Sequence, residues 1–230
     1  MKEKLLNHLK GFVTDERSQK IKGIAEFRTK YITVALEDIY QSQNASAVLR
    51  SCECFGVQDV HIIENRNTYQ VNPDVALGAN KWLNIHRYNR PGINNSLTAI
   101  TQLKNAGYRI VATTPHEQDK NLEYFDLSAG KTALFFGNEL EGLSEEMINS
   151  ADEFLKIPIY GFTESFNISV SVAIILHFIS FQLRNSNIHW QLSENEKIDL
   201  QIQWLKKSIK ESESIEKNFY KNIDKPNSFS

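Results

Sequence analysis

The chain has 230 residues, is 41% hydrophobic and carries a formal net charge of −2. This composition predicts one globular domain with appendages, and the longest apolar stretch, residues 172–181, is shorter than the roughly 20 residues of a membrane-spanning helix. The amino terminus lacks the apolar core of a secretory signal, so we expect a cytoplasmic protein.

Charge is unevenly distributed along the chain. Residues 1–30 contain eight basic and four acidic residues, residues 31–190 contain eleven and seventeen, and residues 191–230 contain seven of each. A basic amino-terminal segment is compatible with binding to a phosphate backbone, and it is equally typical of a solvated helix face. The charge distribution alone therefore does not show whether the protein binds a nucleic acid.

Residues 1–30 have the spacing of one or two amphipathic helices joined near Gly11, and residues 194–222 have that of a charged helix. The last six residues, KPNSFS, are expected to be disordered. We interpret both ends as extensions of a central core. The predicted parts are therefore residues 1–30, 31–190 and 191–230.

The core alternates between short apolar runs and segments of helical spacing. The predicted strands are Ile32–Leu36, Val57–Ile63, Arg109–Thr113, Thr132–Phe136 and Phe154–Ile159. The predicted helices are Ala45–Phe55, Ser96–Ala106 followed by Gly107 at the C′ position, a short turn from Ser144, and Ile168–Leu183. This alternation predicts an α/β domain with a largely parallel sheet.

The first predicted helix of the core contains two cysteines, Cys52 and Cys54. Side chains two residues apart in a helix point to different faces, so the pair forms neither a disulfide framework nor a metal site. Asn44 and Arg50 belong to the same helix. Asn44 is a candidate N-cap and Arg50 a candidate snorkelling side chain, but a separation of six residues also permits both to lie toward one site.

A second polar group follows the strand Thr132–Phe136, where the chain continues Gly137-Asn-Glu139. A glycine at a strand end lets a ligand approach the backbone, and ligands of open α/β sheets bind at the carboxyl ends of strands. Glu139 is either a ligand-facing carboxylate or part of a surface turn. Glu141, two residues later, is expected to be an ordinary surface carboxylate.

A third polar group, Ser165-Phe-Asn167-Ile-Ser169-Val-Ser171, opens the last core helix. Ser165 and Asn167 are both candidate N-caps, but four small polar side chains are more than one cap requires. The amino terminus of a helix also offers free N–H groups to an anion. Dinucleotide, P-loop, zinc-protease and nucleophile-elbow motifs are all absent from the sequence, so these common alternatives lose their support.

In this order, the three groups resemble the motifs of the SpoU/TrmH family of SPOUT RNA 2′-O-ribose methyltransferases. Asn44…Arg50 matches the first motif, Phe136-Gly-Asn-Glu139-x-x-Gly142 the second, and residues 157–170 the third. The resemblance covers about residues 31–185. The short terminal extensions resemble the branch that methylates guanosine 18 in the D-loop of tRNA.

The resemblance implies an α/β sheet with a deep trefoil knot in its carboxyl-terminal part, and a homodimer whose active site is completed across the interface. It implies S-adenosylmethionine as cofactor and no metal. The cofactor-binding positions would be Thr113, Gly137, Ile157, Ile159 and Phe166. The catalytic positions would be Arg50, Asn44, Glu139, Ser165 and Asn167.

The RNA-contacting candidates are basic. They are Lys20, Lys22, Arg28 and Lys30, for each of which a solvated helix face is the alternative, and Arg184 at the end of the last core helix. Close family members have two arginines two apart after the third motif, where this chain has Phe181 and Leu183. Two other functions stay open, namely the same chemistry on ribosomal RNA or another tRNA position, and a catalytically silent RNA-binding relative.

Overall fold

The computed structural model describes residues 1–115 and 119–223, and the expected disordered tail lies outside these ranges. The chain forms two compact units. One unit is Thr29–Trp190, and the other combines Met1–Arg28 with the described residues from Gln191 onward. The three-part division expected from the sequence thus corresponds to two units, since the two ends pack on each other.

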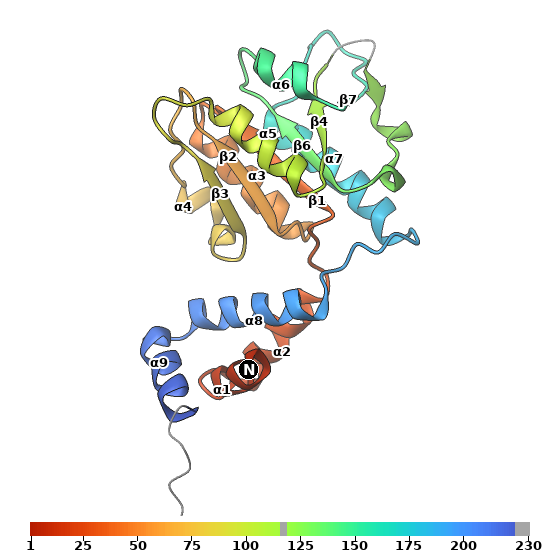
Figure 1. Ribbon diagram of the computed structural model, residues 1–230. Coiled ribbons are helices and arrows are strands. Elements are labelled where there is room, and N and C mark those ends of the chain that lie inside the picture. Colours follow the sequence, from red (N-terminus) through yellow and green to blue (C-terminus); the bar gives the residue numbers. More distant parts are fainter. Residues whose placement is uncertain (116–118, 224–230) are drawn as a thin grey trace, which may run out of the picture. The chain divides into compact units, whose positions relative to one another are not determined.

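The larger unit is built on a sheet of parallel strands (Figure 1). The strand order is β3-β2-β1-β6-β4-β7-β5. The strands are β1 Ile32–Glu37, β2 Asp59–Ile63, β3 Asn84–Tyr88, β4 Arg109–Thr113, β5 Lys120–Asn121, β6 Thr132–Phe136 and β7 Glu153–Lys156. The predicted α/β fold with a mostly parallel sheet is confirmed.

Helices cover both faces of this sheet, which is why its central strands are apolar on both sides. Along β1, Val34 and Leu36 belong to the core shared with α3 and α7, whereas Ala35 belongs to the core shared with α5 and α6. These helices are α3 Ser42–Cys54, α5 Asn95–Asn105, α6 Glu145–Ser150 and α7 Ile168–Arg184. Shorter pieces are α4 Pro73–Ala76, η1 Ala79–Lys81, η2 Leu122–Tyr124 and η3 Leu127–Ala129.

Most predicted elements of the larger unit are present, and two strands were missed. β4 and β6 have the predicted bounds, and Gly107 follows α5 with a φ of 81°, as expected of a C′ glycine. β3 was not predicted because Asn84, His86 and Arg87 make it more polar than a buried strand. β5 has only two residues, too few for any periodic signal.

The smaller unit consists of four helices. They are α1 Lys2–Lys10, α2 Asp15–Ala25, α8 Glu194–Ser208 and α9 Ser212–Ile223. Gly11 follows the end of α1, as predicted. The prediction of a single helix over residues 194–222 was wrong, because two helices, α8 and α9, occupy this segment. The chain turns after α8 at Glu211, whose φ is 58°, and neither glycine nor proline marks the break. Among the described helices, none has both the length and the apolar character needed to cross a bilayer.

Candidate functional site

The carboxyl ends of β4, β6 and β7 surround a cavity of about 680 Å³. Its volume lies within the range of small-molecule sites, and its position is the one that ligands take in open α/β sheets. Nine of the ten predicted catalytic and cofactor-binding residues line it: Asn44, Thr113, Gly137, Glu139, Ile157, Ile159, Ser165, Phe166 and Asn167. The structure thus brings together segments that are up to 123 residues apart in the sequence.

A chain of hydrogen bonds joins the three polar groups at the edge of this cavity. Asn44 Nδ2 donates to Glu139 Oε1 at 2.7 Å, and Asn167 Nδ2 donates to Asn44 Oδ1 at 3.1 Å. Asn167 also caps α7, because its Oδ1 accepts a hydrogen bond from Ser169 N at 2.9 Å. Asn44 is only 9% exposed, so its amide is held in one orientation by the carboxylate and the second amide.

Asn44 does not cap its helix. α3 begins at Ser42 after Gln41, and Asn44 is the third residue of the first turn. Its side chain is therefore available for the contacts with Glu139 and Asn167. Of the two cap candidates in the third group, Asn167 takes that role. Ser165 is exposed in the loop before α7 and lines the cavity.

The loop after β6 passes very close to itself at Gly137. A Cβ added there would lie 2.2 Å from both the carbonyl carbon and the oxygen of Gly142, and 2.4 Å from Leu143 N. Two backbone hydrogen bonds of 2.9 Å between Asn138 and Gly142 close the loop. Glycine is required at 137 by this approach of backbone to backbone, in the wall of the cavity.

The other predicted cofactor residues supply the opposite walls. Thr113 ends β4, and its hydroxyl donates to Phe135 O at 2.7 Å, which ties β4 to β6 beside the cavity. Ile157 and Ile159 follow β7 and are partly buried. Phe166 is 41% exposed, so its ring is available to a ligand. The cavity therefore combines apolar walls with polar groups along one edge, as is typical of small-molecule sites.

Arg50 is the one predicted catalytic residue outside the cavity. It is exposed on α3 and is not part of the lining, whereas Asn44 on the same helix is buried. Six residues rotate a helix by about 240° beyond one full turn, so the two side chains leave α3 in different directions. Within one chain, Asn44 and Arg50 therefore do not point toward one site, although their spacing left that arrangement open.

Most of the basic candidates are accessible, with one exception. Lys20 and Lys22 are exposed on α2, and Lys30 is partly buried. The prediction that Arg28 contacts RNA has to be corrected. Arg28 is 1% exposed, and its guanidinium lies 5.2 Å from the ring centroid of Trp204. A buried cation stacked on an indole supports packing rather than a phosphate contact.

Arg184 at the end of α7 is exposed but engaged. Its Nη2 donates to Phe55 O at 2.9 Å, and its guanidinium lies 5.4 Å from the ring centroid of Trp190. These contacts compete with a phosphate for the Arg184 guanidinium.

The sequence reasoning missed several residues of the cavity, among them Gln41, Asn138 and Ser171. Glu141 also borders the cavity; its side chain is 67% exposed, as expected of a surface carboxylate, and it forms an ion pair with Arg66. The sequence did indicate part of this arrangement, because Glu141 lies inside the loop that the second polar group predicted. Its partner could not be inferred, since Arg66 lies 75 residues earlier.

A separate polar cluster lies across β2 and β3. His61 stacks on His86 with ring centroids 4.7 Å apart, and its Nδ1 lies 3.1 Å from Tyr88 Oη. Burial lowers the pKa of His61 to about 4, with His86 adding to the effect and Asp59 opposing it. In the described ranges, no group of three or more His, Cys, Asp or Glu side chains is placed to hold a metal ion.

Comparison with known proteins gives consistent results. The profile of the SpoU rRNA Methylase family matches residues 31–177. A tRNA (guanosine(18)-2'-O)-methyltransferase of Borreliella burgdorferi is 44% identical over 213 residues, which are 93% of this chain and 95% of the relative.

Solved structures agree with these sequence matches. The Aquifex aeolicus TrmH/SpoU tRNA modifying enzyme superposes with a TM-score of 0.75 at 28% identity, over 86% of this chain and 98% of the other. The SpoU methyltransferase AviRb of Streptomyces viridochromogenes, solved in complex with the cofactor AdoMet, has a TM-score of 0.58 at 21% identity, over 70% and 64% of the two chains. The latter likeness concerns the fold alone.

Proposed function

This chain belongs to the SpoU methylase family, and on that premise we propose that it transfers a methyl group from S-adenosylmethionine to the ribose 2′-hydroxyl of guanosine 18 in tRNA. The relative from Borreliella burgdorferi that carries this activity in its name aligns over 93% of the chain. An alignment of 213 residues is longer than the core unit, so the substrate specificity is inferred from more than the core alone.

One structural observation carries the proposal. Asn44, Glu139 and Asn167 come from three distant segments, and direct hydrogen bonds connect them at the edge of one cavity. Structural caps or surface turns would not require this convergence. An orienting network of amides and a carboxylate is suited to holding ribose hydroxyls, which both donate and accept hydrogen bonds.

The cavity fits S-adenosylmethionine as cofactor. Gly137 leaves no room for a side chain, so that the backbone of residues 137–143 itself forms the wall. Thr113, Ile157, Ile159 and Phe166 would hold the cofactor from the remaining walls. When bound, the cofactor supplies a methyl group already activated on a sulfonium, and the protein chiefly orients the two reactants.

Arg50 acts on the acceptor side. The ribose 2′-hydroxyl must lose its proton as its oxygen bonds to the methyl carbon and the carbon–sulfur bond breaks. An arginine with a pKa above about 12 is a poor base. Arg50 instead holds an RNA phosphate and stabilises the charge that develops on the 2′-oxygen, and the phosphate or another group accepts the proton.

The position of Arg50 outside the cavity favours a homodimeric enzyme with a site completed between two copies. The loop before α7 and α7 itself expose large apolar side chains, with Phe162 and Tyr160 nearly fully exposed and Phe181 exposed to 66%. A second, mostly apolar cavity of about 520 Å³ lies on the same segments. Such a surface is typical of a protein interface.

The remaining parts of the proposal concern the chain's surroundings and its topology. The carboxyl-terminal part, from β6 through α7, forms the trefoil knot of the family. Lys20, Lys22, Lys30 and Arg184 contact phosphates of the tRNA, and such contacts fix position more than sequence. A cytoplasmic location follows from tRNA as the substrate. No metal takes part.

The experiment is methyl transfer to competing substrates. The protein is incubated with labelled S-adenosylmethionine and either unmodified tRNA or ribosomal RNA, and the incorporated label is counted. Label in tRNA alone supports the proposed substrate. Label confined to ribosomal RNA would show that ribosomal RNA, and not tRNA, is the substrate. If neither RNA is labelled although the cofactor binds, the protein is better explained as a catalytically silent relative.

A further inference from the structure

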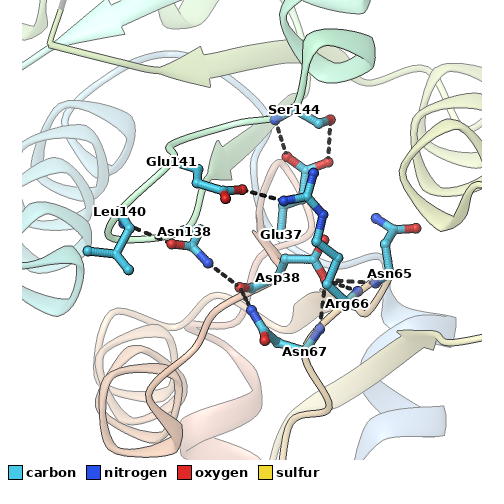
Figure 2. A network of polar contacts seen from close by, with 9 residues as sticks. All are labelled: Glu37, Asp38, Asn65, Arg66, Asn67, Asn138, Leu140, Glu141 and Ser144. Carbon is cyan, nitrogen blue, oxygen red and sulfur yellow. Dashed lines mark hydrogen bonds and ion pairs between the residues drawn. The ribbon is translucent and has the colours of Figure 1, made fainter.

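β1 ends in two carboxylates that the proposed chemistry does not use. Glu37 is 2% exposed, although it is charged and follows five apolar or small residues. Its Oε2 accepts a hydrogen bond from Ser144 N at 2.8 Å, and its Oε1 accepts from Ser144 Oγ at 2.7 Å and from Ser96 Oγ. Figure 2 shows the carboxylate of Glu37 facing Ser144.

The next residue, Asp38, holds a turn of its own. Its φ is 51°, in the left-handed region that costs most residues about 1–3 kcal/mol. In this conformation its Oδ1 accepts hydrogen bonds from the backbone N–H groups of Asn65 and Arg66, at 2.7 and 2.8 Å. Its carbonyl oxygen accepts from Asn138 Nδ2 at 3.0 Å (Figure 2).

These contacts converge on the cofactor loop, which we define as residues 137–143. The Asp38 carbonyl holds the start of the loop through Asn138, and the Glu37 carboxylate holds Ser144, the first residue after it. Between these points, Glu141 pairs with Arg66, whose backbone Asp38 positions. The loop is thus tied at both ends and in the middle to the end of β1.

We infer that Glu37 and Asp38 are positioning residues for cofactor binding, acting through the cofactor loop. The inference rests on the proposed function of that loop. Gly137, with its close backbone contact, and Glu139, with its hydrogen bond to Asn44, both belong to the loop. A shift of the loop ends therefore disturbs the cofactor wall and the polar chain at the same time.

A carboxylate suits this task better than a neutral group. Both oxygens of Glu37 act only as acceptors, and three donors face them. Hydrogen bonds to a charged acceptor are stronger than neutral ones, and the buried position keeps water from replacing them. Glu37→Gln keeps the size of the side chain but removes its charge, so the charge-assisted hydrogen bonds from Ser144 and Ser96 are lost or replaced by weaker neutral ones.

The alternative is that Glu37 only stabilises the fold, and Ser96 separates the two roles. Ser96 donates to the same carboxylate but lies in the first turn of α5, outside the cofactor loop. Ser96→Ala therefore weakens the buried cluster and leaves the loop contacts through Ser144 in place. A purely structural role predicts similar effects of Glu37→Gln and Ser96→Ala on cofactor binding, whereas a positioning role predicts different ones.

The test is calorimetric titration of the full-length protein and its variants with S-adenosylmethionine, followed by methyl-transfer kinetics. For Glu37→Gln we expect the Kd to rise about tenfold or more, since charge-assisted hydrogen bonds are lost. The KM for S-adenosylmethionine should rise with it, and kcat should fall as well because Glu139 belongs to the same loop, while the KM for tRNA changes less. For Ser96→Ala the Kd should stay within about threefold of wild type.

The inference is overturned if Glu37→Gln has the same Kd as wild type, or if Glu37→Gln and Ser96→Ala raise the Kd equally. Methylation of tRNA by the wild-type protein would still support the proposed function in either case. Wild-type protein that binds no S-adenosylmethionine overturns both. If Glu37→Gln does not fold, Ser144→Ala serves as a second variant: it removes the hydroxyl contact with Glu37 and the side-chain cap of α6, and it leaves the Ser144 N contact with Glu37 in place. A smaller rise in Kd then supports the inference, and an unchanged Kd overturns it.

Discussion

The substitution Gly137→Ala tests the close backbone contact in the cavity wall. The added Cβ would lie 2.2 Å from two backbone atoms of Gly142, whereas ordinary contacts begin at 3.4 Å. Because the obstructing atoms belong to the backbone, no side chain can rotate away. The loop must open, and the two hydrogen bonds of 2.9 Å between Asn138 and Gly142 are lost.

Each of these hydrogen bonds contributes about 1 kcal/mol net, so opening the loop costs about 2 kcal/mol. If the cofactor binds only the closed loop, that cost appears as an increase in Kd of about 30-fold. If the loop opens in the free protein as well, part of the cost appears as a lower free energy of unfolding. Overpacking of similar severity costs about 1–3 kcal/mol in other proteins.

The assay is calorimetric titration with S-adenosylmethionine, together with urea unfolding to measure stability. Gly161→Ala is the matched control, because Gly161 also lies in a loop near the cavity and an added Cβ would meet nothing closer than Thr163 N at 4.0 Å. An unchanged Kd for Gly137→Ala, in protein that folds normally, would refute the argument that the backbone at Gly137 forms the cofactor wall.

Three further predictions concern other residues. Arg50→Ala should abolish methyl transfer and leave the calorimetric Kd for S-adenosylmethionine near the wild-type value; loss of both would make Arg50 structural. In Arg50→Lys, activity with a pH profile shifted toward the lysine pKa would favour a base over our charge-stabilising role. Asn44→Asp places a second carboxylate against Glu139, 2.7 Å from the present amide, and should lower kcat/KM about tenfold or more; unchanged kinetics would remove Asn44 from the site. The pKa of His61 is lowered to about 4 in the folded chain, from 6.5, so the unfolded chain takes up this proton first as the pH falls, and stability is lost between those two values. Urea unfolding at pH 8 and pH 5 should differ by about 2 kcal/mol from this residue, and His61→Gln should reduce the difference; an equal difference in the variant would contradict the assignment.

The sequence was most informative where one local rule decides the structure. β4, β6 and the amino terminus of α7 follow from apolar runs and an asparagine cap, and they have the predicted bounds. β3 could not be predicted in this way, because a strand with three polar residues out of five is held by its neighbour and not by its own pattern. The turn at Glu211 likewise depends on tertiary packing.

The candidate site shows the same limit. Spacing identified Asn44, Glu139 and Asn167 separately, but their hydrogen bonds join residues 95 and 123 positions apart, which no local rule predicts. The role of Glu37 was not predicted because it is the last residue of a buried strand, and a charged residue at that position is usually interpreted as the start of a loop. The rule that ligands bind at the carboxyl ends of parallel strands was the available signal.

The most direct measurement is the position of the methyl group in the product. Unmodified tRNA is methylated by the protein, digested with nuclease and analysed by mass spectrometry, beside a tRNA whose guanosine 18 is replaced by adenosine. We expect 2′-O-methylguanosine at position 18 of the first tRNA and little product from the second. Methylation at another nucleotide, or equal methylation of both tRNAs, would contradict the proposed function.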